Sequence, residues 1–338
     1  MKILLITPTQ TGIGGIAQHV SGLTNFLKMN GNDVDIISSE NTFTIPIKGL
    51  KNPSFMFSSF FKTKFKNDYD LVHAHNIPSA LAMKNVKGKK ILTIHGVFSK
   101  QIKQLHGNRI ETFSQKYENN ALKWSDAITV VSKEAYEYYT DLGYNVSQIP
   151  NAIDISSLTL DVDRKYENQI IFAGRLSHEK GINLLLEIAK KLPENLNLLI
   201  LGSGPEEKKV QDLAKTQNNV HYLGYQSKEK TISLIRGSDV LIQPSLNEGI
   251  SSTIIEGMAC KIPIIATNVG GNKELIKEET GLLVDSNLSS DFINKIEYIF
   301  SNQSKFQHIT NNAFDFIQQY DWKVVGKKYL KLYQSLLE

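Results

Sequence analysis

The feature that most constrains the fold is a regular alternation of short apolar runs with amphipathic stretches along the whole chain. The runs are four to six residues long and rich in β-branched residues. Helical periodicity separates them, as at Ile16, Val20, Leu23 and Leu27, which are spaced i, i+4, i+7 and i+11. This alternation is typical of βαβ units and predicts an α/β protein with parallel sheets covered by helices on both faces. The runs occupy residues 2–7, 34–38, 70–75, 90–95, 127–131, 146–150, 169–174, 196–201, 220–224, 239–244, 263–267 and 281–284.

The alternation pauses between residues 151 and 168, where the sequence is polar and has no period. A chain of 338 residues is long enough for two domains of ordinary size. We therefore expect two doubly wound, Rossmann-like domains, residues 1–160 together with a C-terminal helix at 320–338, and residues 161–319. Ligands of such sheets bind beyond the carboxyl ends of the strands, which predicts a site in a cleft between the domains.

Composition indicates a globular enzyme, because 41% of the residues are hydrophobic and 21% are charged. The single cysteine, Cys260, excludes a disulfide framework and predicts a reducing, cytoplasmic compartment, with the thiol as a small core group. We expect neither a signal peptide nor a membrane span, since no apolar stretch approaches roughly 20 residues. Residues 1–150 hold 17 basic against 11 acidic side chains, a net +6, whereas the remainder carries −2.

The segment from residue 49 to residue 66 combines five phenylalanines with lysines. One interpretation is an interfacial element that makes peripheral contact with the inner face of a membrane. The alternative is a core helix with a solvated basic face, in which many of the aromatic rings cover a sheet. The sequence favours the core helix slightly and leaves both open.

Two glutamates eight positions apart, Glu248 and Glu256, flank a predicted helix N-terminus. Ser251 and Ser252 are good N-cap residues, and residues 253–259 have the pattern of a helix. The first turn of a helix exposes N–H groups and the positive end of its dipole, so it is suited to phosphate oxygens. Glu248 could then accept hydrogen bonds from a sugar and Glu256 from a ribose. Two unrelated acids on a surface helix are the plain alternative.

Two cations precede another predicted helix in the sequence GRLSHEKG, residues 174–181. Arg175 could bind a diphosphate through its planar fork, and Lys180 could bind it as a point charge. Either residue alone would be ordinary in a solvated loop. Together with a helix N-terminus suited to an anion, they favour a nucleoside diphosphate site.

The sequence GIGGIA, residues 12–17, matches the short dinucleotide fingerprint, with Glu40 at the end of the next predicted strand. This is the main rival signal. No tyrosine is followed four positions later by lysine, which excludes the usual catalytic pair of short-chain dehydrogenases and epimerases. We interpret Gly14 and Gly15 as a loop whose N–H groups meet a phosphate or an acceptor.

Three histidines end two predicted strands: His73, His75 and His95. We expect His73 and His75 to point to opposite faces of their strand, which argues against a zinc site. His95 could hydrogen-bond a sugar or its leaving phosphate, although a packed strand-end histidine explains the pattern equally well. The three Asp-x-Asp patterns are interpreted as solvated acids, so no metal is expected.

The ordered set of motifs resembles the retaining glycosyltransferases of family 4, also called group 1, which have the two-domain GT-B fold. The resemblance covers nearly the whole chain. Its carriers are the Gly14-Gly15 loop, PNAID at 150–154, GRLSHEKG at 174–181, LGSGPE at 201–206, YLGY at 222–225, SDVLIQPS at 238–245, the Glu248/Glu256 pair, and PIIATNVGG at 263–271 followed by Glu274.

The resemblance implies a role for each matching residue. The N-terminal domain would bind the acceptor and the C-terminal domain the donor, with a final helix that crosses over to the N-terminal domain. Glu248 and His95 would be the catalytic residues beside the donor sugar. Gly14 and His75 would lie on the acceptor side. The donor-binding set would be Gly15, Arg175, Lys180, Tyr225, Ile250, Ser251 and Glu256.

The implied activity is metal-independent, retaining transfer of a sugar from a nucleotide-sugar to a glycan or a lipid-linked acceptor. No cofactor and no nucleic-acid partner are expected. Cations and a helix N-terminus would stabilise the negative charge that develops on the leaving phosphate. Three alternatives keep the fold: a nucleotide-sugar epimerase, a pyridoxal phosphate phosphorylase and an inactive binding subunit of a glycosylation complex.

Overall fold

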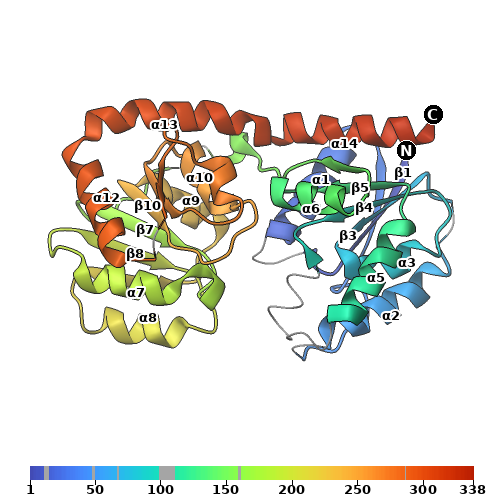
Figure 1. Ribbon diagram of the computed structural model, residues 1–338, viewed down its shortest axis with the longest axis horizontal. Coiled ribbons are helices and arrows are strands. Elements are labelled where there is room, and N and C mark those ends of the chain that lie inside the picture. Colours follow the sequence, from blue (N-terminus) through green and yellow to red (C-terminus); the bar gives the residue numbers. More distant parts are fainter. Residues whose placement is uncertain (11–14, 48–49, 67, 99–110, 159–160, 286) are drawn as a thin grey trace. The chain divides into compact units, whose positions relative to one another are not determined.

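Two six-stranded parallel sheets form the framework of the computed structural model (Figure 1). The structure describes residues 1–10, 15–47, 50–66, 68–98, 111–158, 161–285 and 287–338. The chain divides into two units, which are Met1–Ile153 with Trp322–Glu338 and Asp154–Asp321. The division at Ile153 lies seven residues before the boundary expected from the sequence. The expected α/β class with doubly wound sheets is confirmed.

The sheet of the first unit has the strand order β2-β1-β3-β4-β5-β6. Its neighbouring strands all pair in parallel. Apolar runs form the interior strands because both faces of the sheet are covered by helices, so every side chain along a strand must be apolar or paired. The strands are β1 (Lys2–Thr7), β2 (Asp33–Ser38), β3 (Leu71–His75), β4 (Lys89–Ile94), β5 (Ala127–Val130) and β6 (Val146–Gln148).

Helices cover the two faces of this sheet differently. On one face, α1 (Gly15–Met29) and the C-terminal α14 (Trp322–Leu337) pack on Ile3 and Leu5 of β1. The predicted stripe of α1 at Val20, Leu23 and Leu27 lies in this core. The alternate residues of β1 face the other helices, as the two-residue period of a strand requires. Those helices are α2 (Lys51–Thr63), α3 (Ala80–Met83), α5 (Glu111–Lys123) and α6 (Lys133–Asp141).

Close packing of α14 on α1 depends on a glycine from each helix. A Cβ atom added to Gly22 of α1 would lie 2.2 Å from the Trp322 side chain. One added to Gly326 of α14 would lie 2.5 Å from the Phe26 ring. Since these distances are far below van der Waals contact, a larger residue at either position would force the two helices apart. The final helix expected at 320–338 is α14, which begins at Trp322 and groups with the first unit.

The sheet of the second unit has the order β12-β11-β10-β7-β8-β9 and is also parallel. Its strands are β7 (Gln169–Ala173), β8 (Asn197–Leu201), β9 (Val220–Gly224), β10 (Val240–Gln243), β11 (Ile264–Thr267) and β12 (Leu282–Val284). Its helices are α7 (Ile182–Lys191), α8 (Glu207–Ala214), α9 (Lys228–Arg236), α10 (Ser252–Ala259), α11 (Asn272–Leu275), α12 (Ser289–Ser301) and α13 (Gln303–Ile317). The strand order reverses direction beside β7 and β10, which makes their carboxyl ends the topological switch point.

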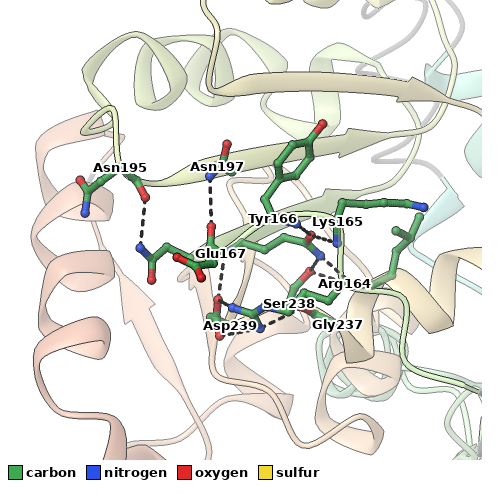
Figure 2. Close-up of polar contacts among 12 residues, drawn as sticks. Arg164, Lys165, Tyr166, Glu167, Asn195, Asn197, Gly237, Ser238 and Asp239 are labelled. Carbon is green, nitrogen blue, oxygen red and sulfur yellow. Dashed lines mark hydrogen bonds and ion pairs between the residues drawn. The ribbon is translucent and has the colours of Figure 1, made fainter.

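At its amino end, β7 is anchored by a polar network drawn in Figure 2. Arg164 binds both carboxylate oxygens of Asp239, at 3.1 and 2.7 Å. The backbone N–H of Gln169 donates to the same carboxylate, at 2.8 Å. This bidentate pair ties the segment before β7 to the start of β10.

The buried Gln169 side chain completes the network. Its amide nitrogen donates to Ser238 Oγ at 2.8 Å, and its oxygen accepts from the backbone N–H groups of Lys165 and Tyr166 at 2.9 and 3.2 Å. We predict that Gln169→Leu lowers the free energy of unfolding by about 1–3 kcal/mol, because the polar groups around it lose their partners. Urea titration checks this value. An unchanged midpoint of the urea transition would show that water replaces the lost hydrogen bonds at no cost in free energy.

Candidate active site

Four loops at the carboxyl edge of the second sheet pack directly on one another. The backbone N–H of Leu246, after β10, donates to the carbonyl of Glu179, after β7, at 2.9 Å. The N–H of Gly271, after β11, donates to the carbonyl of Glu248 at 3.1 Å. The loop after β8 joins them, since a Cβ atom at Gly202 would lie 1.8 Å from the carbonyl oxygen of Gly174. The predicted strand-end motifs of this unit therefore form one connected surface.

Two glycines permit the closest approaches within this surface. Gly181 has φ +69°, and a Cβ atom there would lie 1.8 Å from the Pro244 carbonyl oxygen. Gly270 has φ +46°, and its Cβ atom would lie 1.8 Å from the Glu248 carbonyl oxygen. Any side chain would be strained in both backbone conformation and space. These glycines hold the backbone around Glu248 in place.

Lys180 and Glu248 form an ion pair that could not be predicted from the sequence alone. Lys180 Nζ contacts Glu248 Oε1 directly, and the Glu248 side chain is only 9% exposed. A carboxylate with so little access to water requires a cation, because an unpaired charge in that environment is costly. The pair holds a positive and a negative group side by side at the carboxyl edge of the sheet. Arg175, from the same loop, is exposed.

The helix predicted at residues 253–259 is confirmed as α10, which begins at Ser252. Ser251 is its N-cap, and the Ser251 hydroxyl accepts from the backbone N–H of Ile254 at 3.5 Å. Because Gly257 allows close contact with Leu241 of β10 and Ile264 of β11, the helix lies tightly against the sheet. Its N-terminus follows the Glu248 loop directly, as the sequence predicts.

Glu256 is buried inside this helix, with 6% of its surface exposed. Burial raises the pKa of its carboxyl group to about 7, and Lys228, whose Nζ lies 3.8 Å from Oε1, opposes that rise in part. Lys228 is the first residue of α9, and sequence reasoning missed it. Tyr225, expected near a nucleotide base, lies just beyond β9 and is exposed.

At the carboxyl edge of the first sheet, the prediction for His73 and His75 is wrong. Their rings lie 4.2 Å apart on one face of β3. Residues i and i+2 of a strand point to the same side, so the period of two requires this arrangement. His95 joins them after β4, with its Nε2 atom 3.2 Å from His75 Nδ1. Even so, no group of three metal-ligating side chains suited to a metal ion occurs among the described residues.

The glycine loop of the first unit is only partly described. Gly15 begins α1, whereas Gly14 lies outside the described residues. Glu40, the acid of the rival dinucleotide fingerprint, accepts from the backbone N–H of Gln10 at 3.1 Å. This contact is a local anchor between the ends of β1 and β2.

Two family models match the chain in succession. The model described as Glycosyltransferase Family 4 matches residues 13–157, and the model described as Glycosyl transferases group 1 matches residues 162–316. The two matches correspond closely to the two units. The chain is a family 4 glycosyltransferase.

Known proteins similar to this glycosyltransferase share its length and fold. The phosphatidyl-myo-inositol mannosyltransferase of Mycobacterium leprae is 22% identical, with 99% of this chain and 97% of the relative covered. Sucrose-phosphate synthase from Thermosynechococcus elongatus has a TM-score of 0.83 at 22% identity, with 99% and 98% of the two chains covered. Anabaena HepE in complex with UDP-glucose has a TM-score of 0.74 at 17% identity, with coverage of 99% and 100%. The glycosyltransferase therefore has the GT-B fold, and its family transfers sugars from nucleotide-sugar donors.

Within the second unit, the structure brings together most of the predicted catalytic and donor-binding residues of this glycosyltransferase. Lys180, Glu248, Ile250, Ser251 and Glu256 lie on the connected loops or on α10. In the first unit, His75 and His95 lie together. Lys180 and Glu248 also contact each other directly, and the role of each residue toward a ligand stays a prediction.

Proposed function

We propose that this glycosyltransferase binds its nucleotide-sugar donor at the carboxyl edge of the second sheet and transfers the sugar with retention of anomeric configuration and without a metal ion. The observation that carries the proposal is the Lys180–Glu248 pair beside the N-terminus of α10. A nucleotide-sugar has hydroxyl groups next to a diphosphate. The pair offers an acceptor for the hydroxyls and a cation for the phosphates at neighbouring positions.

The chemistry follows from where charge develops during transfer. As the bond from the anomeric carbon to the phosphate breaks, negative charge accumulates on the leaving phosphate oxygens. Lys180, Arg175 and the N–H groups at Ile250 and Ser251 would stabilise that charge. In this proposal Glu248 holds the sugar, Glu256 binds the ribose hydroxyls, and Tyr225 faces the base.

The reaction class is tested by product analysis with UDP-glucose and other nucleotide-sugars in the presence of a chelator. We expect a glycosidic product whose anomeric proton coupling matches that of the donor. A free epimerised nucleotide-sugar would instead support the epimerase alternative. Absence of turnover with any donor and acceptor would support an inactive binding subunit.

For the acceptor, we propose a lipid-linked molecule reached by peripheral attachment to the cytoplasmic face of a membrane. Among the described helices, none combines the length and apolar character needed to cross a bilayer. The surface of α2 and of the turn after it offers another means of attachment. Phe57 and Phe61 of α2 are 63% and 57% exposed, and Phe65, two residues beyond α2, is 88% exposed. Only Phe55 of the five aromatic rings is fully buried, so fewer of them cover the sheet than the core-helix alternative expects.

Basic side chains accompany these exposed rings. Lys64 Nζ lies 5.0 Å from the centre of the Phe61 ring. Aromatic rings next to lysines suit the interface of an anionic bilayer, where the rings enter the headgroup region and the ammonium groups meet lipid phosphates. The M. leprae relative, by its name, acts on phosphatidyl-myo-inositol, which is itself a lipid.

We predict that the Phe57→Ser/Phe61→Ser double variant binds anionic vesicles about tenfold or more weakly than the wild type. Each ring that enters the membrane interface contributes on the order of 1–2 kcal/mol to binding. Co-sedimentation with phosphatidylglycerol-containing vesicles at low salt measures this. Leu142→Ser, at another exposed apolar position of the first unit, is the matched control. Wild-type protein that stays in the supernatant at low salt would refute the attachment.

A further inference from the structure

Four of the eight histidines of the chain gather in the first unit. His19 of α1, His73 and His75 of β3, and His95 after β4 have ring centres 4.2–5.7 Å apart in the four closest pairs. His19, His73 and His75 are almost completely buried. Such a concentration of imidazoles requires an explanation, because each ring has two polar atoms that must find partners when water is absent.

His73 has a purely structural arrangement. Its Nδ1 atom lies 2.6 Å from the Tyr333 hydroxyl of α14, and its Nε2 atom lies 2.6 Å from Thr93 Oγ1. Both ring nitrogens are thus satisfied by hydroxyl groups, which can donate or accept. His73 therefore stabilises the packing of α14 on the sheet.

His75 and His95 are arranged differently. His75 Nδ1 and His95 Nε2 share one hydrogen bond of 3.2 Å. The other nitrogen of each ring, His75 Nε2 and His95 Nδ1, is buried and has no hydrogen-bond partner within the described part of the chain. Burial lowers the pKa of His95 to about 4 and that of His75 well below its usual value, so both rings are neutral and each carries one proton.

Only two proton arrangements fit this pair. If His95 Nε2–H donates, His75 must carry its proton at Nδ1 or Nε2. A proton at His75 Nδ1 would face the hydrogen donated by His95, so the His75 proton must be at Nε2. His75 Nε2 is then a buried N–H group without an acceptor. If His75 Nδ1–H donates, His75 Nε2 is left with an unpaired lone pair, which is the smaller penalty. His95 then carries its own proton at Nδ1.

Asn151 favours the second arrangement. Its side-chain Oδ1 atom is a buried acceptor that lacks a partner among the described residues. The Asn151 side chain also partly opposes the effect of burial on the pKa of His95, which indicates that the two groups interact. A His95 ring protonated at Nδ1 would supply the donor that Asn151 lacks. The backbone of His95 is fixed as well, because its N–H donates to Asn76 Oδ1 at 2.9 Å.

We propose that His75 is a positioning residue that holds His95 as the neutral Nδ1–H tautomer. In this state the lone pair at His95 Nε2 is occupied by His75. His95 therefore acts as a hydrogen-bond donor through Nδ1–H and does not serve as a general base. This inference rests on the proposed function and on the catalytic role that the family resemblance implies for His95. It excludes His95 as the base, so the proton of the acceptor hydroxyl would pass to an oxygen of the leaving phosphate.

The tautomer is measured directly by nitrogen NMR on protein labelled with ¹⁵N-histidine, with the His95 signals assigned through a His95→Gln variant. Correlations between ring nitrogens and carbon-bound ring protons distinguish the two neutral tautomers. We expect His95 to be protonated at Nδ1 in the wild type. Protonation at Nε2 would overturn the proposal, whether or not the protein transfers sugar.

Two variants of His75 separate positioning from packing. Asparagine places an amide donor near the position of Nδ1, whereas glutamine places its amide near the position of Nε2. We expect His75→Asn to keep the His95 tautomer. His75→Gln should shift the proton to Nε2 and lower kcat about 10- to 100-fold relative to His75→Asn, with a smaller change in KM.

The outcomes also separate this proposal from the proposed function. If His95 has the same tautomer in the two His75 variants and their kcat values are equal, the proposed positioning role of His75 is contradicted. A changed tautomer with unchanged kcat would support positioning and count against the catalytic role of His95. If neither variant folds, the wild-type tautomer alone decides the question.

Discussion

Lys180→Met should lower kcat/KM of sugar transfer about 100- to 1000-fold, which is the loss typical of removing one charge-stabilising group from the transition state. Lys180 is the cation nearest to the predicted sugar-binding carboxylate, Glu248. Initial rates of glycosyl transfer measure the effect. Lys190→Met, which removes an exposed lysine from α7, is the matched control and should retain wild-type activity.

Loss of Lys180 also leaves the poorly exposed Glu248 carboxylate without its partner, so stability must be separated from chemistry. The double variant Lys180→Met/Glu248→Gln removes both charges. We expect it to recover most of the thermal stability lost by Lys180→Met while remaining inactive. Recovery of activity together with stability would show that the pair is structural and that the assignment of Lys180 is wrong.

Glu256→Gln should stabilise the protein at high pH by about 3 kcal/mol, the value that corresponds to raising the pKa of a carboxyl group from 4.5 to about 7. The folded state binds the Glu256 proton more tightly than the unfolded state does. The stabilisation that comes from binding this proton is therefore complete below pH 4.5 and is lost as the pH rises to about 7 and above. Glutamine has no such proton to lose.

Urea titrations of the wild type and of Glu256→Gln between pH 4 and pH 8 test the direction of this pH dependence. The stability difference should be small at the acidic end and should grow in favour of Glu256→Gln as the pH rises. Glu187→Gln, at an exposed position of α7, provides the matched control for removing one carboxylate. A difference that is constant with pH, or that grows toward acid, would contradict the account. The same variant should bind nucleotide-sugars more weakly, which would explain why a destabilising carboxylate is present.

Sequence patterns predicted the strands and α10 well because those elements depend on local information. A short apolar run between helical stretches can satisfy its backbone only within a sheet, and Ser251 caps α10 through an atom of its own side chain. The pairing of Lys180 with Glu248 was not predictable in this way. The two residues are 68 positions apart, and only the packing of the loops after β7 and β10 brings them together.

Two errors have specific physical causes. In α2 the buried face is formed by Phe55, Ser59 and Thr63, so small polar residues occupy core positions and fewer phenylalanine rings are buried than the core-helix alternative expects. The number of aromatic residues in the segment did not show which face of the helix packs on the sheet. In β3, His73 and His75 were placed on opposite faces although an i, i+2 pair must share one face. Correct use of the strand period would have predicted the histidine cluster.

The donor site at the carboxyl edge of the second sheet is tested most directly by calorimetric titration of the wild type and of a folded Lys180→Met/Glu256→Gln variant with UDP-glucose and other nucleotide-sugars. We predict that at least one nucleotide-sugar binds the wild type and that the double variant binds it about 100-fold or more weakly, because two charge-assisted contacts are lost. Equal affinity in the two proteins would contradict the placement of the donor on this edge.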